Sequence, residues 1–328
     1  MKNNHLLSNS SPGALIGKSS RLKRNLKILK SQAGLQAMVI PWIILILIFS
    51  YIPMYGLIMA FQQYNLGDMV GFSKWVGVKN FRDFFNEPDL WLIMRNTFAI
   101  SLLKLAIGFP LPILLAILLN EVRHDKFKRT IQTISYLPHF ISWVVVAGLA
   151  FDILSVDGGI INHTLQALGV IKTPILFTGE PKYFWSIVVS TDVWKEIGWS
   201  AIIYIAAITS IDQELYEAAS IDGAGRLKKI WHITLSGIKP TVVIMLILAV
   251  GGILNAGFEQ ILLLTNNLRN TMVYDTSEIL DTFVYRQGIV QMRFSFATAA
   301  GIFKSVLSVV LLTIANKAAN KISEQGLW

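Results

Sequence analysis

Three charged residues, Asp192, Lys195 and Glu196, interrupt an apolar stretch that runs from Phe184 to Ile208. A charged side chain at membrane depth costs about 2.5 kcal/mol or more, so such residues tend to face a cavity or a partner. In a helix the lysine lies one turn from the aspartate on about the same face. One reading is an ion pair, or a snorkelling end, that lets the stretch insert. The other is a polar path, in which Trp194 offers a sugar a flat ring.

Two further lysines and one acidic residue stand in other apolar stretches of the chain. These are Lys104, Lys304 and Glu259, the last of which follows Asn255 by about one helical turn beside Gln260. Glu259 and Gln260 fit two roles equally well, the lining of the same path and a hydrogen bond between neighbouring helices.

The composition indicates that these residues stand in a membrane protein. Of the 328 residues, 53% are hydrophobic and 15% are charged, against about 25% charged in soluble domains. The chain has no cysteine, which excludes disulfides, thiolate metal sites and thiol nucleophiles. A net charge of +9 would suggest nucleic acid in a soluble protein, but here it is better explained by membrane topology.

Six stretches are apolar and long enough to cross a hydrocarbon core of about 30 Å as helices. Helices are expected because the alternation of a barrel strand is absent. We predict an all-α, polytopic bundle of six transmembrane helices over 37–317, flanked by cytoplasmic tails 1–36 and 318–328. The predicted spans are 37–61, 97–120, 130–154, 184–208, 241–265 and 295–315.

The distribution of basic residues predicts the orientation. Residues 1–36 contain no acidic residue, and the segments assigned to the cytoplasm hold 17 Lys or Arg against 8 in the outside loops 62–91, 155–183 and 266–294. Positively charged loops stay in the cytoplasm, so both termini are predicted to lie there. A cleaved signal peptide is the alternative for the N-terminus, but its apolar run is too long for one.

The loop 209–240 differs from the other cytoplasmic connections. Ser210 is followed three residues later by Gln213, which predicts the start of a short helix by a capping box. Small residues follow, and Gly223 and Gly225 then favour its end. A helix of this kind can lie in a groove on a partner.

This loop resembles the cytoplasmic coupling motif of permeases in binding-protein-dependent ABC importers. The likeness rests on Glu217-Ala-Ala-Ser-Ile-Asp-Gly223, Ile233-Thr-Leu235 and Pro240, although Ser236 stands where the family usually has proline. It implies a cytoplasmic coupling helix that contacts an ATPase. The coupling residues it implies are Glu217, Ala218, Ala219, Asp222, Gly223 and Arg226.

Within that family the chain looks most similar to permeases for polysaccharides such as alginate. The stretches that carry this are Trp194–Trp199, Ala256–Leu264, Asp281–Arg286 and Gly326–Trp328. The resemblance implies a bacterial plasma-membrane complex of two different permeases, a homodimeric ATPase and an extracytoplasmic sugar-binding protein. The chain lacks the Gly-x-x-x-x-Gly-Lys-[Ser/Thr] motif, so it is expected to be no enzyme and to hold no cofactor, with ATP and Mg bound by the partner ATPase.

Similarity to the maltose-importer permease implies a substrate path along the third, fourth and fifth spans. Matched positions, with Trp194 and Glu259 added from the residue types, are His139, Trp143, Asp192, Trp194, Lys195, Glu196, Gly252, Asn255 and Glu259. Asn255 keeps an amide suited to maltose, whereas the other replacements are charged or aromatic. They leave room for an acidic oligosaccharide paired with Lys195.

Two other functional classes remain open at this point. An ion-coupled secondary transporter also suits six spans with buried charges, but the sequence shows no convincing internal repeat. A purely structural membrane subunit gives no reason for the motif between Glu217 and Gly223.

The topology predicts a labelling pattern in this cysteine-free chain. Cysteines introduced at Ser10 or Ser220 are expected to resist an impermeant thiol reagent in intact cells, whereas a cysteine at Ser73 is expected to react. Labelling in the reverse pattern would overturn the orientation.

Overall fold

The computed structural model describes residues 31–323. Residues 1–30, with the basic flank, and 324–328, with Gly326–Trp328, therefore lie outside the described part. The chain divides into two compact units, Met1–Leu57 and Ile58–Trp328.

The first unit supplies the beginning of a long apolar helix. This helix starts as α2 (Ala33–Ile46), passes through a π-helical turn η1 (Leu47–Tyr51) and continues as the 3-10 segment η2 (Ile52–Phe61). Pro53 has no N–H to donate to the preceding turn, which explains why the hydrogen-bond pattern changes there. The resulting segment of 29 residues covers the predicted first span.

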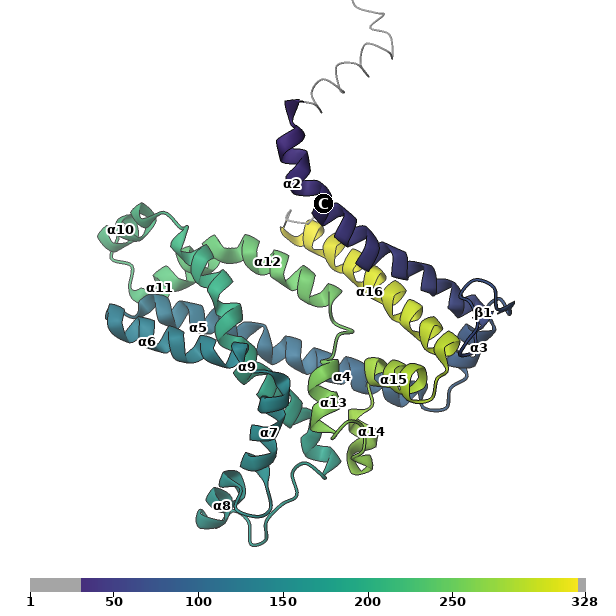
Figure 1. Ribbon diagram of the computed structural model, residues 1–328. Coiled ribbons are helices and arrows are strands. Elements are labelled where there is room, and N and C mark those ends of the chain that lie inside the picture. Colours follow the sequence, from purple (N-terminus) through teal and green to yellow (C-terminus); the bar gives the residue numbers. More distant parts are fainter. Residues whose placement is uncertain (1–30, 324–328) are drawn as a thin grey trace, which may run out of the picture. The chain divides into compact units, whose positions relative to one another are not determined.

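The second unit is helical apart from a strand pair, β1 (Gln62–Gln63) with β2 (Lys74–Trp75), in antiparallel register (Figure 1). Its other elements are α3 (Lys79–Phe85), α4 (Leu90–Gly108), α5 (Pro110–Glu121), α6 (Asp125–Tyr136), η3 (Leu137–Phe140), α7 (Trp143–Leu154), α8 (Ile160–Ala167), α9 (Pro181–Thr209), α10 (Gln213–Ile221), α11 (Arg226–Lys229), η4 (Ile230–Thr234), α12 (Leu235–Gly251), α13 (Phe258–Leu264), η5 (Thr271–Val273), α14 (Tyr274–Ser277), α15 (Leu280–Tyr285), η6 (Arg286–Val290) and α16 (Phe294–Ser323). The fold is therefore the predicted all-α class.

Four helices of the described part are long and apolar enough to cross a membrane, or five if one bent pair is a single span. They are Ala33–Phe61, Leu90–Glu121, Arg226–Gly251 and Phe294–Lys321. The helix α9 has 29 residues and is also long enough, but it carries Asp192, Lys195 and Glu196. The number six stays a prediction, since α9 has a polar middle.

The predicted third span, 130–154, is not one helix. The segment Asp125–Phe140 meets α7 at an angle of 103°. Pro138 lies in the 3-10 turn η3, and Ser142 then adopts an extended backbone and accepts a hydrogen bond from the Val145 N–H. The prediction of a continuous helix is wrong here because hydropathy alone does not register a proline followed by a helix cap.

The predicted fifth span, 241–265, is also displaced and interrupted. The helix begins at Arg226, within the predicted loop 209–240, and ends at Gly251. Residues 252–257 form a break, and Gly257 adopts φ of +102°, a conformation that favours glycine. Pro240 lies inside α12 and does not mark its start. The prediction of a continuous span is wrong because hydropathy does not register the glycines at which the helix ends.

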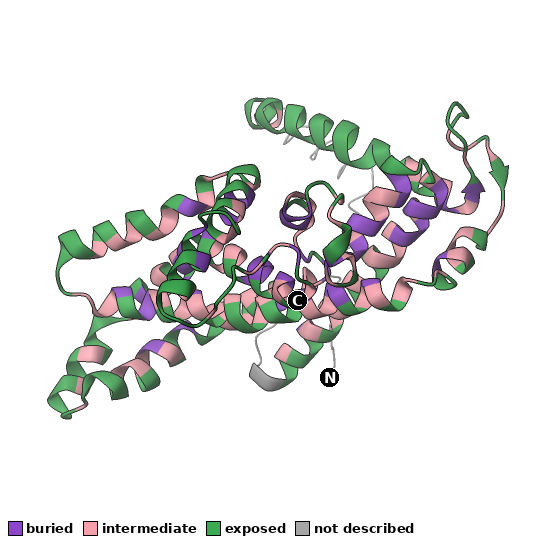
Figure 2. Ribbon diagram, turned by 90° about the horizontal axis from the view of Figure 1, so that it is seen from below, coloured by how far each residue is buried: buried purple, intermediate pink, exposed green. Residues whose placement is uncertain are grey.

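The helix α9 lies at the centre of the second unit, against α4, α5, α6 and α12. One core cluster joins Ala201, Tyr204 and Ile208 of α9 to Ala116 of α5 and Ile238 of α12. Figure 2 shows such buried positions along the inner faces of the helices, whereas their outer faces are exposed. Exposed apolar faces are expected in a protein whose solvent is lipid.

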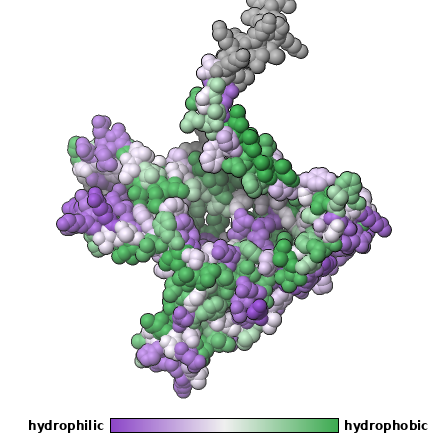
Figure 3. All heavy atoms as spheres, viewed as in Figure 1, coloured by the Kyte–Doolittle hydropathy of each residue, from purple (hydrophilic) through white to green (hydrophobic). Residues whose placement is uncertain are grey.

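The two ends of α9 mark the two ends of this unit. Its C-terminus leads to α10, and its N-terminus lies beside α14 and the chain that follows α8 (Figure 1). Figure 3 shows hydrophilic residues gathered around α10 and around α8, with many hydrophobic residues on the surface between them. A hydrophobic band between polar ends fits a protein that crosses a bilayer.

The contact between α9 and α6 predicts a sensitive glycine. A Cβ atom added at Gly198 would lie 2.0 Å from the Ser135 carbonyl oxygen, so Gly198→Ala must push the helices apart. We expect a loss of about 1–3 kcal/mol of stability, seen as a lower thermal midpoint of the purified chain in detergent.

The matched control is Gly148→Ala in α7, where an added Cβ meets nothing within 4 Å. It is expected to be neutral or slightly stabilising, because alanine favours helix. Equal midpoints for the two variants would contradict the proposed close packing.

Candidate functional site

A cavity of about 240 Å³ lies where α4 and α9 meet the break after α12. Of the predicted path residues, Asp192, Glu196, Gly252 and Asn255 line it. Its other polar lining residues are Ser101, Lys104 and Ser200. The fourth predicted span and the break thus supply its polar wall, and α4 adds a lysine that the predicted path did not include.

Lys104 connects three helices at this cavity. Its ammonium lies 2.7 Å from Asp192 Oδ1 on α9 and donates to Gln260 Oε1 on α13, also at 2.7 Å. The Gln260 amide in turn donates to Thr191 Oγ1 at 2.7 Å. An added Cβ at Gly257 would stand 2.7 Å from the Lys104 ammonium, so glycine leaves room for this network.

Lys304 forms a second network on the other side of the break. From α16 its ammonium reaches Asp281 Oδ1 at 2.5 Å and Asn255 Oδ1 at 2.7 Å. Each of the two lysines therefore holds one carboxylate and one amide oxygen. Together they anchor the break at Asn255 and, through Gln260, the helix α13 that follows it.

Lys195 lies at the bend between η3 and α7. It is 5% exposed, and its ammonium donates to the carbonyls of His139 at 2.5 Å and Ile141 at 2.8 Å, with that of Pro138 at 3.4 Å. It also lies 5.5 Å from the ring centre of Trp143. Where the helix is broken, Lys195 thus serves the carbonyls of His139 and Ile141, whereas the Pro138 carbonyl also accepts from the Ile141 N–H.

The spacing left open an ion pair of Lys195 with Asp192, and the two residues do not pair. Asp192 is bound by Lys104 from another helix, and Lys195 lies 3.8 Å from Glu196. Helical spacing placed the two residues on one face, but the tertiary structure gave each a partner from another segment. The same burial argues against Lys195 as the group that meets a sugar.

His139 joins the bend to the cavity wall. Its Nδ1 lies 2.8 Å from Glu196 Oε2, and its ring stacks on Trp199 at 4.3 Å between centroids with an interplanar angle of 1°. His139 thus contacts Glu196, which lines the cavity, but does not line the cavity itself.

Trp194 and Glu259 do not line this cavity. Trp194 is 45% exposed and lies with Trp185 in a separate, apolar groove between α4 and α9. Glu259 is exposed in the first turn of α13. Their residue types suggested sugar contacts. Trp194 lies on the face of α9 that borders the apolar groove, and the direction of Glu259 depends on the start of α13, which follows the break at 252–257.

The predicted coupling residues lie on α10, in the turn after it and, for Arg226, at the start of α11. Asp212, and not the predicted Ser210, caps α10, because its Oδ1 accepts from the Glu214 N–H at 3.0 Å. Glu217 and Ala218 are exposed, and Gly223 has φ of +74°. Tyr216 Oη lies 2.9 Å from Oγ1 of Thr234, which is buried at the start of α12. The small helix is thus hydrogen-bonded to the long helix that follows.

Residues 108–323 match the family described as "binding-protein-dependent transport system inner membrane component". The chain belongs to this family. It is therefore the permease subunit of a carbohydrate ABC importer and a multi-pass membrane protein, not an enzyme.

Two kinds of relative illustrate the likeness. The polygalacturonan/rhamnogalacturonan transport system permease protein YteP of Bacillus subtilis is 45% identical over 96% of both chains. A chain of a bacterial ABC transporter involved in the import of the acidic polysaccharide alginate superposes with a TM-score of 0.83 and 41% identity, over 92% of this chain and 99% of that one. A chain of a bacterial alginate ABC transporter in complex with an alginate pentasaccharide-bound periplasmic protein is similar to the same degree, with a TM-score of 0.83 and 40% identity. The resemblance drawn from the coupling loop is confirmed, and a secondary transporter is not supported.

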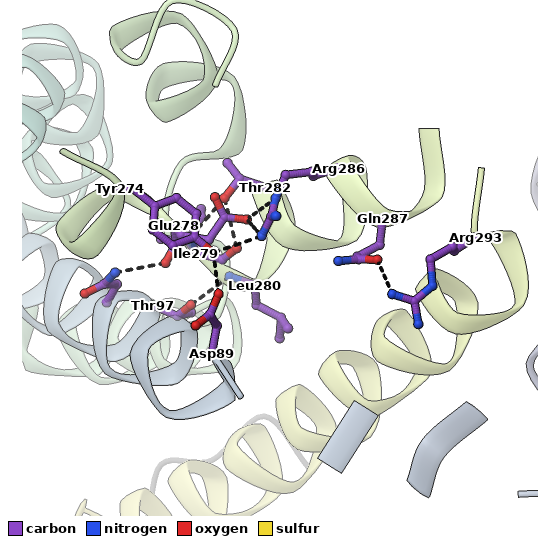
Figure 4. Close-up of polar contacts among 11 residues, drawn as sticks. Asp89, Thr97, Tyr274, Glu278, Ile279, Leu280, Thr282, Arg286, Gln287 and Arg293 are labelled. Carbon is purple, nitrogen blue, oxygen red and sulfur yellow. Dashed lines mark hydrogen bonds and ion pairs between the residues drawn. The ribbon is translucent and has the colours of Figure 1, made fainter. Parts of the chain in front are cut away.

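A further polar cluster, which the sequence did not reveal, lies at the end of the permease opposite to α10 (Figure 4). Glu278, 2% exposed, pairs with Arg286 at 3.0 Å, and Tyr274 donates to Asp89 Oδ2 at 2.7 Å. Burial raises the pKa of Glu278, and the Arg286 charge opposes that shift. Burial, reinforced by the hydrogen bond to Asp89, also raises the pKa of Tyr274.

This cluster holds the segment 274–290 against the start of α4. The Leu280 N–H donates to Thr97 Oγ1 at 2.9 Å across the same contact. The stretch Asp281–Arg286 carries part of the family likeness, but Glu278 lies outside it, eight residues before Arg286. The sequence therefore did not indicate this ion pair. The segment is a fixed part of the permease and not a loose connection.

The bend predicts the effect of removing the Lys195 ammonium. Lys195→Met leaves the carbonyls of His139 and Ile141 without this donor, so the permease is expected to lose about 2 kcal/mol or more of stability. Thermal unfolding in detergent measures it.

Lys182→Met, on the same helix but with an exposed side chain, is the control and should unfold like the native chain. Transport by any residual Lys195→Met protein should fall equally for every substrate. A stable variant that loses acidic sugars alone would restore Lys195 as a sugar contact.

Proposed function

We propose that this permease pairs with a second, different permease to form the path of an acidic oligosaccharide. An extracytoplasmic binding protein delivers the sugar, and a cytoplasmic ATPase dimer, which binds ATP and Mg, drives its passage. Both termini and α10 face the cytoplasm in this proposal, in agreement with the excess of basic residues in those segments.

The acidic character of the substrate is supported by the relatives. One is named for polygalacturonan, a polymer of a uronic acid, and another for the acidic polysaccharide alginate. Both are more than 40% identical to this chain over nearly its whole length. Sugar monomers of these polymers carry a carboxylate, which a neutral binding cavity would not distinguish from a hydroxymethyl group.

The observation that carries the coupling role is the helix α12, which lies between α10 and the cavity. Tyr216 of α10 is hydrogen-bonded to Thr234, and α12 then runs 17 residues, about 26 Å, to Gly252 on the cavity wall. A displacement of α10 by a partner therefore has a rigid element through which to reach the 252–257 break.

The surface of α10 suits a groove on the ATPase. Ala218 and Ala219 allow close approach, Leu215 and Ile221 are exposed apolar anchors at 54% and 88%, and Glu217 offers a carboxylate. An amphipathic helix with spaced apolar anchors is a common mode of docking into a groove.

The function is tested by reconstituting the permease with its partner permease, ATPase and binding protein in vesicles. ATP-dependent uptake of trigalacturonate or alginate trisaccharide is expected, with little uptake of maltotriose. Uptake of maltotriose alone would contradict the proposed substrate class.

Glu217→Ala and Gly223→Pro are expected to insert normally but to lose most binding-protein-stimulated ATP hydrolysis, because one removes a docking charge and the other cannot adopt the positive φ. Glu180→Ala, an exposed acidic residue before α9, should keep it. Full stimulation in both coupling variants would sink the coupling role.

A further inference from the structure

We propose that Lys104, with Ser101 one turn before it on α4, receives the carboxylate of a uronic acid residue in the cavity. The inference rests on the proposed function and names the group that distinguishes acidic from neutral sugar. It replaces Lys195, whose ammonium is buried against backbone carbonyls.

Lys104 retains donor capacity that the protein does not use. An ammonium has three N–H donors, and within the described residues two of them meet Asp192 Oδ1 and Gln260 Oε1. Its side chain is 13% exposed and lines the cavity. The third donor is available to a group that enters.

Ser101 supplies a second, independent observation. Its residue is 6% exposed and lines the same cavity, and its hydroxyl is a buried polar atom without a hydrogen-bond partner among the described residues. Such orphan groups are rare, because an unmade hydrogen bond in an apolar site is costly. At a spacing of three residues, Ser101 and Lys104 lie on one face of α4 and offer two donors, which matches the two oxygens of a carboxylate.

The charges around the cavity leave Lys104 as the receiving cation. Asp192 pairs with Lys104, whereas Glu196 lies beside both His139 and Lys195. Lys104 and Lys195 balance the charges of Asp192 and Glu196. The cavity therefore carries no excess of negative charge that would repel an acidic sugar. Of the described residues that line it, Lys104 is the cation.

Lys304 provides a matched control within the same chain. It too holds one carboxylate and one amide oxygen, at Asp281 and Asn255, and its side chain is 19% exposed. It is not among the residues that line the cavity. A variant of Lys304 therefore disturbs a similar network beside the same break without removing a cavity donor.

The test compares uptake of trigalacturonate with uptake of its carboxyl-reduced counterpart, trigalactose, by the reconstituted importer. The ratio of acidic to neutral uptake by each variant is divided by the ratio for the native complex. The binding protein is the same in both, so its own preference cancels. Lys104→Gln is expected to lower the ratio of acidic to neutral uptake about tenfold or more, and Ser101→Ala to lower it several-fold. Lys104→Arg keeps the charge and should retain most of the ratio, and Lys304→Gln should leave it unchanged.

An unchanged ratio in both Lys104→Gln and Ser101→Ala overturns the proposal. Equal loss for both sugars in Lys104→Gln, restored by adding Asp192→Asn, shows a structural ion pair and also overturns it. If Lys104→Gln does not fold, Ser101→Ala alone decides, since it removes one oxygen atom. Failure of the native complex to take up trigalacturonate would instead refute the proposed function itself.

Discussion

The apolar core of a bilayer contains no water that could satisfy a backbone carbonyl or an ammonium, so each must find its partner within the protein. That constraint decides how the breaks in the helices of this permease are stabilised. Lys195 donates to the carbonyls freed at the bend between η3 and α7. Lys304 holds Asn255 within the 252–257 break, and Lys104 holds Gln260 in the helix that follows it. Each charged side chain at these sites also lies near an opposite charge.

The cavity is a consequence of those breaks. Where α12 ends at Gly251, the chain leaves the helical path, and the space beside α4 and α9 is lined by Gly252 and Asn255. Non-helical backbone at membrane depth is tolerated where it lines such a space. Lys104 and Lys304, which stabilise the break, thus also place polar groups on the cavity wall: Lys104 lines it, and Lys304 holds Asn255 there. The stability of the fold is therefore linked to its capacity to bind a polar solute.

The two ends of the second unit are built differently from its middle. At one end, α10 presents exposed small and apolar side chains but is hydrogen-bonded to Thr234. At the other, Glu278, Arg286 and Tyr274 fix the segment after α13 onto the start of α4. A partner at either end therefore acts on segments that are fixed to long helices, and such contacts carry displacement better than flexible loops do.

The sequence by itself determined the class of the protein, because hydropathy, basic residues and the motif from Glu217 to Gly223 depend on local composition and order. It also singled out residues that line one cavity in the structure, namely Asp192 and Glu196 of α9 and Gly252 and Asn255 of the segment after α12. Only the tertiary structure decided how the charges pair. Lys104 and Asp192 are 88 residues apart, and Lys195 binds a carbonyl 56 residues away, so the spacing within one helix could not reveal either partner. The bend at Ser142 and the break before Gly257 were likewise beyond hydropathy, since a chain can leave the helix within the membrane only where another segment satisfies its freed backbone groups.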